Sequence, residues 1–213
     1  MDRKQGDRLT VLTFDEAAHQ YFWNGEPRPN VTRIIAPLTD YSHIPAATLL
    51  RAQEEGKAVH KMVELDCKND LNLDELPEWL RPYFKAWCRF KDETGFECWD
   101  AERRFYNEPL GYAGTLDLAG LLPKLPKVKD GALIDVKRSL YAGPAIGLQT
   151  IAYEGGRNAL VPKDLRTSRR FALILKPDES YRLPEFNDPD DRGAFLACLQ
   201  QLRWKEKHYV RRA

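Results

Sequence analysis

Several features that identify common classes of protein are missing from this sequence. No apolar run approaches the roughly 20 residues that a membrane-spanning helix needs, and residues 1–7 lack the apolar stretch of a signal peptide. Neither Gly-x-Ser-x-Gly nor His-Glu-x-x-His occurs, which leaves little support for a serine hydrolase or a zinc peptidase. Internal repeats and low-complexity segments are absent too. These absences predict an intracellular globular protein.

Cysteine is scarce and scattered. The four cysteines are Cys67, Cys88, Cys98 and Cys198, and they form no Cys-x-x-Cys pair. Closely spaced cysteines are typical of zinc sites and of small disulfide-rich domains. The spacing here therefore predicts reduced thiols, without a zinc site or a disulfide framework.

The chain also carries almost no net charge, +1, which favours no particular partner. Its distribution is more informative, because residues 66–78 are strongly acidic whereas residues 157–176 hold six basic side chains against the single acid Asp164. The basic residues are Arg157, Lys163, Arg166, Arg169, Arg170 and Lys176. Such segregation predicts either a basic groove for nucleic acid or an ordinary solvated face.

The order of predicted elements indicates a mixed α/β fold. We expect a hairpin at 12–23 followed by an Asn-Gly turn, strands at 96–106, 112–118, 132–137, 170–176 and 181–183, and helices at 46–67, 77–94, from 144, and at 190–209. A short helix capped by Asn30 or Thr32 should stop at Pro37, and the aromatic stripe from Trp79 to Phe90 should lie in the core. The 213 residues fit one domain with a mixed central β-sheet flanked by helices and the site at one edge of the sheet.

The functional prediction depends on two neighbouring strands. In Ala132-Leu-Ile-Asp-Val-Lys137 an apolar run ends in two charges, and strand alternation puts Asp135 and Lys137 on one face with Val136 in the core. The strand before it ends near Asp117, and the prolines and Asp-Gly between the two indicate a turn. We therefore expect an antiparallel pair that brings Asp117 beside Asp135.

Two carboxylates held side by side repel each other unless a cation lies between them, and oxygen ligands of this kind favour Mg²⁺ or Mn²⁺. Phosphodiester cleavage needs a metal to polarise the phosphoryl oxygen and a cation to orient the nucleophile or offset developing charge. Asp117, Asp135 and Lys137 supply these parts. Other acid-x-Lys triplets occur at 2–4, 55–57 and 66–68, but only 135–137 closes an apolar strand. The alternative is a surface hairpin with ordinary charges.

The same residues carry a resemblance to a known family. Gly114-x-x-Asp117, Asp135-x-Lys137 and Gln149-x-x-x-Tyr153 resemble, in order, the motifs of the PD-(D/E)xK nuclease superfamily and in particular its RecB-like exonuclease branch. Upstream, Gly56-Lys-Ala-Val-His60 looks like the Gly-x-x-x-His of that branch, and residues 12–21 with 30–35 are similar to openings of phage-encoded members. The resemblance implies a restriction-endonuclease-like core within one nuclease domain over 1–213. In that domain an N-terminal hairpin and helices occupy 1–95, the catalytic core 96–176, and a C-terminal strand and helix 177–213.

The resemblance also implies roles for individual residues. The implied metal ligands are His60, Asp117, Asp135 and the Val136 carbonyl, the residue that positions attacking water is Lys137, and the pair that braces the substrate phosphate is Gln149 and Tyr153. Each role has a plain alternative. His60 could be a packing or surface residue, and the last two could belong to an ordinary amphipathic helix with a buried tyrosine.

Two glutamates are further candidates. Glu64 lies four residues after His60 on the same helical face and could reach the same metal, although an exposed helical glutamate is the default. Glu102, in the strand at 96–106, could help to hold a second metal, as a glutamate near this point sometimes does in the family. The alternative that we favour for Glu102 is a strand-surface acid paired with an arginine.

Together these inferences predict a DNA exonuclease that depends on Mg²⁺ or Mn²⁺ and serves phage recombination or DNA processing in the cytoplasm of a bacterial host. The alternatives are a structure-specific or restriction-type endonuclease of the same superfamily, and a non-catalytic DNA-binding or interaction protein on the same fold. Some RecB-like branches hold an iron-sulfur cluster on one upstream cysteine and three near the C-terminus, where this chain has only Cys198, so no cluster is expected. The expected partner is duplex or single-stranded DNA, with a recombination protein or further copies of the chain as additional candidates and no membrane.

Overall fold

The computed structural model describes residues 11–40, 42, 44–126, 128, 130–138 and 143–209, so the expectation about residues 1–7 lies outside the described residues. A small antiparallel sheet comes first and consists of β1 (Leu12–Asp15), β2 (Gln20–Trp23) and β3 (Glu26–Arg28). Asn24 and Gly25 join β2 to β3 with left-handed backbones, φ 54° and 82°, as a two-residue hairpin turn requires. The hairpin signal in the sequence is thus confirmed.

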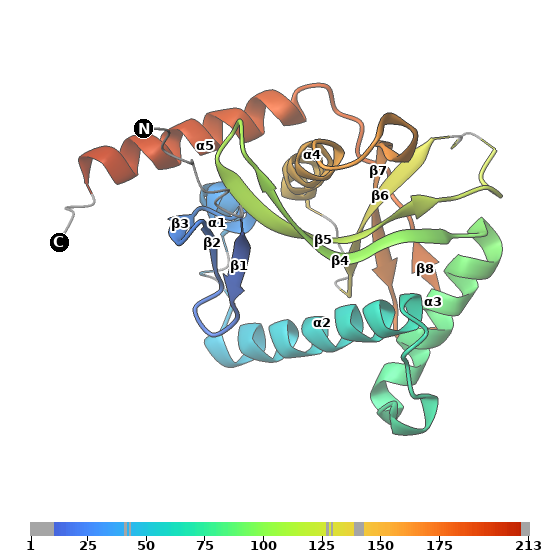
Figure 1. Cartoon of the computed structure of the whole chain (residues 1–213). Helices are drawn as coiled ribbons and strands as arrows, with labels where there is room; N and C mark the ends of the chain where they lie inside the picture. The colour runs from blue at the N-terminus through green and yellow to red at the C-terminus, as the bar shows by residue number, and fades with distance from the viewer. Residues whose placement is uncertain are drawn as a thin grey trace, which may run out of the picture.

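A five-stranded mixed sheet forms the centre of the molecule (Figure 1). Its strands lie in the order β4 (Glu97–Asn107), β5 (Tyr112–Leu121), β6 (Gly131–Lys137), β7 (Thr167–Leu175) and β8 (Tyr181–Arg182). All neighbours are antiparallel except β6 and β7, which are parallel and therefore need the crossover that α4 (Ala145–Asn158) provides. The predicted antiparallel pairing of β5 with β6 is confirmed.

Helices cover both faces of this sheet (Figure 1). On one face lie α2 (Ala46–Cys67) and α3 (Arg81–Thr94), whose apolar side chains share a core with β6 and β7. On the other lie α1 (Val31–Ile35), α4 and α5 (Asp191–His208), which enclose a second core with β5. Short 3-10 turns occur at Ala36–Leu38, Leu73–Glu75, Glu78–Leu80 and Lys163–Leu165. The predicted fold class, a mixed sheet flanked by helices, is confirmed.

The ends of the helices follow sequence signals. The Asn30 side chain accepts a hydrogen bond from the Arg33 amide and so caps α1, which settles the choice between Asn30 and Thr32. Gly95, with φ 67°, ends α3 in the left-handed conformation that favours glycine. Within the described ranges, none of the helices combines the length and the apolar character that crossing a membrane would require.

The aromatic stripe before and within α3 is buried only in part. Tyr83, Trp87 and Phe90 are buried as predicted, but Trp79 is 45% exposed, so its assignment to the core is wrong. The reason is local, because Trp79 lies in the 3-10 turn Glu78–Leu80 and the α-helix begins only at Arg81. The 3.6-residue period therefore does not extend back to Trp79.

The predicted location of the site at an edge of the sheet is also wrong. Asp135 lies on β6, the middle of the five strands, because β7 and β8 are added beyond it after the α4 crossover. β5 and β6 pair only where Leu118–Gly120 lies opposite Ala132–Ile134. The rest of β5 pairs with β4 alone. The two strands therefore part at Asp117 and Asp135, inside the sheet.

Packing between α4 and β4 gives a test of this core. A Cβ atom on Gly156 would lie 2.0 Å from Cε2 of the buried Phe105, whereas one on Gly193 in α5 would meet nothing within 4 Å. We expect Gly156→Ala to lower the free energy of unfolding by about 1–3 kcal/mol through overpacking. The matched Gly193→Ala should raise it by up to about 1 kcal/mol, because alanine is the better helix former. Urea unfolding of both variants measures this, and equal effects would contradict the described packing.

Candidate metal centre

Three side chains from three different elements converge beside the point where β5 and β6 part. His60 comes from α2, Glu102 from β4 and Asp117 from β5, and their ligand atoms all lie within 4.8 Å of one another. Nδ1 of His60 is 3.5 Å from Oε1 of Glu102 and 3.5 Å from Oδ1 of Asp117. The neighbouring Val59 and Val63 of α2 are fully buried, which fixes the helix over the sheet and aims His60 at the two acids.

Glu102 does not behave as predicted. It faces His60 rather than an arginine, while the adjacent Arg103 pairs with Asp100 at 2.8 Å and Arg104 with Glu16 at 3.5 Å. The backbone explains the difference, because Glu102 is left-handed (φ 50°), a conformation that non-glycine residues adopt rarely and often at functional sites. Simple strand alternation cannot reveal such a residue. The favoured assignment as an arginine-paired surface acid is therefore wrong.

Asp117 and Asp135 come together as expected. In the β5–β6 register they are the next opposed pair after Leu118 and Ile134, and Oδ2 of Asp117 accepts a hydrogen bond from the Val136 amide at 2.6 Å. Nζ of Lys137 lies 2.7 Å from Oδ2 of Asp135, which is completely buried. The structure thus brings Asp117, Asp135 and Lys137 to one place, with the Val136 side chain turned into the core as predicted.

Burial and mutual repulsion dominate the electrostatics of these groups. Burial raises the pKa of Asp135 to about 6, helped by the charge of Asp117 and opposed by Lys137. Burial would also raise the pKa of Asp117, but His60, Lys137 and the Val136 amide hold it below its usual value. For His60, burial would lower the pKa, yet the two nearby carboxylates raise it to about 10. The cluster therefore attracts positive charge strongly.

The donor set fits a divalent cation. Carboxylate oxygens with one imidazole are ligands that Mg²⁺ and Mn²⁺ accept. Oδ2 of the buried Asp135 pairs with Lys137, whereas Oδ1 has no hydrogen-bond partner among the residues that the structure describes. The charges of Lys137 and His60 compensate this carboxylate in part. A metal ion would offset the remaining repulsion and would take the place of the proton on His60.

Gln149 and Tyr153 lie on the face of α4 that is turned toward the acids. Nε2 of Gln149 donates to the Tyr153 hydroxyl at 2.9 Å. Burial and the charges of Asp117 and Asp135 raise the pKa of Tyr153 well above its usual value, so the phenol stays protonated. The ring fits beside Gly114, where a Cβ atom would lie 3.1 Å from Cε1 of Tyr153. The predicted pair is thus next to the site and keeps a neutral hydroxyl there.

Glu64 lies outside the cluster. Its carboxylate forms ion pairs with Lys61, at 2.9 Å, and with Lys68. Both partners belong to the same helix or its cap, so Glu64 pairs within α2 and does not join the cluster, although its side chain is only 15% exposed and is therefore not the exposed acid of the default expectation.

Sequence reasoning gave no role to Tyr21, which also reaches this region. Its buried hydroxyl is hydrogen-bonded to Oγ1 of Thr115, 2.6 Å away and 94 residues further along the chain. The pKa of Tyr21 is raised by burial and responds to the charges of Arg104 and Glu102. Thr115 lies two residues before Asp117 on β5, so this bond attaches the N-terminal sheet to β5 close to the acidic cluster.

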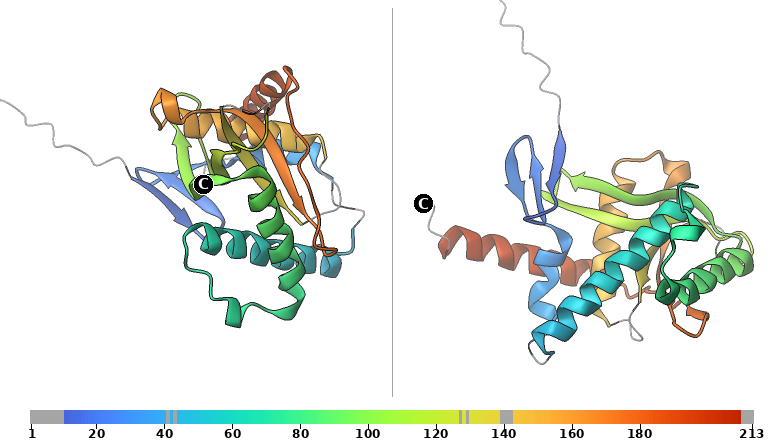
Figure 2. Two further views of the ribbon diagram at one scale, coloured as in Figure 1. Left: turned by 90° about the vertical axis from the view of Figure 1, so that its right-hand side faces the viewer. Right: turned by 90° about the horizontal axis from the view of Figure 1, so that it is seen from below.

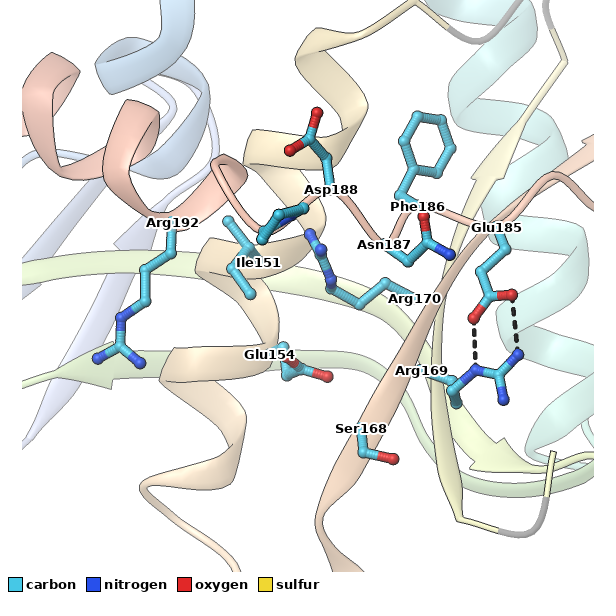
Figure 3. Close-up of a pocket in the computed structure, with 11 residues that line it drawn as sticks. Ile151, Glu154, Ser168, Arg169, Arg170, Glu185, Phe186, Asn187, Asp188 and Arg192 are labelled. Atoms are coloured by element: carbon cyan, nitrogen blue, oxygen red, sulfur yellow. Dashed lines mark hydrogen bonds and ion pairs between the residues drawn. The ribbon is translucent and has the colours of Figure 1, made fainter.

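Half of the basic residues in the stretch 157–176, for which the sequence left open a groove or a solvated face, are neutralised by acids. Arg157 is buried and pairs with Asp100 at 2.6 Å, and the buried Arg170 pairs with Asp191 at 2.9 Å. Arg169 pairs with Glu185 through two of its nitrogens (Figure 3). Three of the six basic residues therefore hold the fold together, and for them the prediction of a free basic surface is wrong.

Arg169 and Arg170 border a cavity of about 520 Å³ that is separate from the acidic cluster (Figure 3). It lies between α4, the start of β7 and the segment that leads into α5. Glu154 of α4 lines it, and Oε1 of Glu154 has no hydrogen-bond partner among the described residues. Burial raises the pKa of Glu154 to about 7. The groups needed to hold a metal and handle a phosphate meet at the cluster and not in this cavity.

Comparisons with known proteins find no close relative. No family model and no curated protein sequence matches the chain. Among solved structures, the protein SSO0001 is 16% identical with a TM-score of 0.33, over 59% of this chain and 63% of its own, so the chain spans less than two thirds of that protein. An alkaline exonuclease from Laribacter hongkongensis is 16% identical with a TM-score of 0.33, over 86% of this chain and 95% of its own. Its complex with dAMP gives 17% identity and a TM-score of 0.31, over 84% and 92%. Likenesses this weak carry no inference about function, which rests instead on the geometry of the site.

The two glutamates near His60 give a matched test of the metal centre. Mn²⁺ should raise the melting temperature of the protein, because a ligand that binds only the folded state stabilises it. Glu102→Gln should weaken the apparent Mn²⁺ affinity by about tenfold or more, whereas Glu64→Gln should leave it unchanged. A Mn²⁺ titration followed by thermal melting measures both. Equal affinities for the two variants would contradict the assignment of Glu102.

Glu154→Gln should change how stability depends on pH. Because the folded-state pKa of Glu154 is about 7 against an ordinary value of 4.5, its stabilising contribution is complete below pH 4.5 and is lost as the pH rises through about 7. Glutamine does not titrate, so the variant should gain unfolding free energy relative to the parent between about pH 5 and about pH 8, by up to about 3 kcal/mol. Urea unfolding at both pH values measures the difference. A difference in unfolding free energy between variant and parent that is the same at both pH values would mean that Glu154 is not buried as described.

Proposed function

We propose that this protein is a divalent-metal-dependent nuclease that hydrolyses phosphodiester bonds in DNA and acts as an exonuclease. The observation that carries the proposal is the meeting of His60, Glu102 and Asp117 within 4.8 Å of one another, next to the buried Asp135–Lys137 ion pair. A structural ion-pair network would not need three acids and a histidine in one place, because unpaired buried charge is costly.

In this proposal the chain holds Mg²⁺ or Mn²⁺ through His60, Asp117, Asp135 and the Val136 carbonyl, with Glu102 as an additional ligand. The bound cation supplies Lewis-acid polarisation of the scissile phosphate. Asp117 is held in place by the Val136 amide, so the ligand needs no rearrangement before it binds.

The remaining residues act on the substrate and the nucleophile. Lys137 keeps an ammonium group beside Asp135, from which it can orient the attacking water and offset charge that develops on the phosphate. Tyr153 keeps its proton and can donate it in a hydrogen bond to a phosphate oxygen, while Gln149 fixes the direction of the phenol.

The ordered motifs and the mixed sheet with its α4 crossover support a restriction-endonuclease-like core and the RecB-like branch of the PD-(D/E)xK superfamily. A single domain, DNA as substrate, a phage or prophage origin within a bacterial cell, and a role in recombination or DNA processing belong to the same proposal. The proposal also includes a recombination protein or further copies of the chain as partners, and it includes no iron-sulfur cluster.

Asp135→Asn tests the proposal directly. It removes one charge from the buried pair without changing size, so cleavage should fall by on the order of 10²–10³-fold. Because the buried carboxylate is a source of repulsion, the metal-free variant should be at least as stable as the parent protein. Cleavage of end-labelled linear DNA with Mg²⁺ or Mn²⁺ measures the first effect and urea unfolding the second, with Glu64→Gln as the active control. Undiminished cleavage by Asp135→Asn would refute the assignment.

The same assay separates the alternatives when the substrate is varied. An exonuclease degrades linear DNA and leaves closed circular DNA intact because it needs an end, whereas a structure-specific or restriction-type endonuclease cuts circles. A non-catalytic DNA-binding protein retains DNA on a filter but cleaves neither form with any metal.

A further inference from the structure

The C-terminal end of α5 presents an exposed aromatic cluster that the proposed chemistry does not use. It consists of Trp204, His208 and Tyr209, and we call it the α5 aromatic cluster. Trp204 is 52% exposed and Tyr209 is 73% exposed. The Trp204 ring centroid lies 4.9 Å from that of His208 and 5.6 Å from that of Tyr209, so the three rings form one surface.

Packing of the helix explains why this surface is open. The buried Phe195 and Leu199 dock the first half of α5 on the core. Further along, Glu206 pairs with Arg33 of α1 at 2.8 Å, and Arg203 donates to the Leu110 carbonyl. These contacts hold one side of the helix, and its last turns extend away from the body of the molecule (Figure 2). Trp204 is on the side that remains open.

Cationic and amide side chains surround the rings. Lys207 and His208 lie three and four residues after Trp204 and therefore share its helical face, as do Gln200 and Gln201 before it. Lys205 and Lys207 are exposed and form no ion pair with the residues that the structure describes. Exposed rings flanked by unpaired ammonium groups are the combination with which proteins bind single-stranded nucleic acid, since bases stack on the rings and phosphates meet the cations.

We propose that the α5 aromatic cluster is a binding surface for single-stranded nucleic acid, on which a base stacks against Trp204 while Lys205 and Lys207 contact the flanking phosphates. The inference rests on the proposed nuclease function in one respect, that the strand bound here is the substrate. Trp204 lies 13 residues beyond Asp191, about 20 Å along the helix, so this surface lies well away from the start of α5.

A second copy of the chain is the other occupant that an exposed aromatic surface could take. The charge argues against it, because apposed copies related by a two-fold axis would bring Lys205 and Lys207 close to the same residues of the partner. The test therefore includes the oligomeric state as an outcome.

The experiment measures binding of a fluorescein-labelled, 20-nucleotide single strand by anisotropy, in chelator so that no cleavage occurs. Trp204→Ala should weaken binding by about tenfold, the typical effect of removing one stacking ring. The matched control is Trp79→Ala, since Trp79 is 45% exposed but lies in an acidic stretch. The control should bind as tightly as the parent protein.

Two further readouts exclude a merely structural effect. Trp204→Phe keeps a ring for stacking, so it should retain binding but lose part of the tryptophan fluorescence quenching that the single strand causes. With metal, Trp204→Ala should raise the KM for the long single strand while leaving hydrolysis of bis-p-nitrophenyl phosphate unchanged, because that ester is too small to reach α5.

The proposal would be overturned if Trp204→Ala and Trp79→Ala bound the single strand with equal affinity. It would also be overturned if light scattering showed that the parent protein is a dimer and that Trp204→Ala is a monomer. Neither result touches the proposed function, which fails if the parent protein cleaves no DNA with either metal or if Asp135→Asn cleaves DNA as well as the parent does. Loss of binding in Trp204→Ala together with full activity in Asp135→Asn would keep the binding surface and remove the metal centre.

Discussion

The hydrogen bond from the Val136 amide to Asp117 is the contact on which the rest of the site depends. It forms where β5 and β6 stop pairing, so a side-chain oxygen replaces a backbone carbonyl as the partner of a strand amide. This exchange satisfies the amide while opening the sheet, and it holds one carboxylate beside another in a buried position. Burial, helped by the charge of Asp117, raises the pKa of Asp135, and the two carboxylates attract the positive charges of His60 and Lys137.

Each neighbouring element contributes a side chain beside these buried carboxylates. α2 contributes a histidine, β4 has a left-handed backbone at Glu102 so that this side chain turns inward, and α4 contributes a neutral phenol rather than a fourth acid. α4 reaches this position because it is the connection between the parallel strands β6 and β7. The parallel pairing and the placement of Tyr153 therefore have the same topological cause.

Much of the fold and part of the site could be predicted from the sequence. Alternation in 132–137 and the hairpin spacing were enough to predict that Asp117, Asp135 and Lys137 lie together, and helical spacing predicted Gln149 beside Tyr153. Local patterns could not reveal Glu102, whose orientation depends on a left-handed backbone, or Tyr21, whose partner is 94 residues away. They also overstated the basic surface, because the acids that neutralise Arg157, Arg169 and Arg170 are distant in the chain. Trp79 was misassigned for the opposite reason, a helical period extended beyond the true start of the helix.

The candidate ligands are spread along the chain from His60 to Asp135, and Tyr153 follows on the next helix, so no short fragment contains the centre. Loop closure over such separations is slow and comes late, because many ordered contacts must form before distant segments meet. A growing polypeptide would thus contain the acids at separate places, and the metal centre would form only when the five-stranded sheet has assembled and α2 has packed against it. Under the proposed nuclease function, assembly itself acts as a safeguard, since an incomplete or misfolded copy has no metal centre with which to cleave nucleic acid in the cell that makes it.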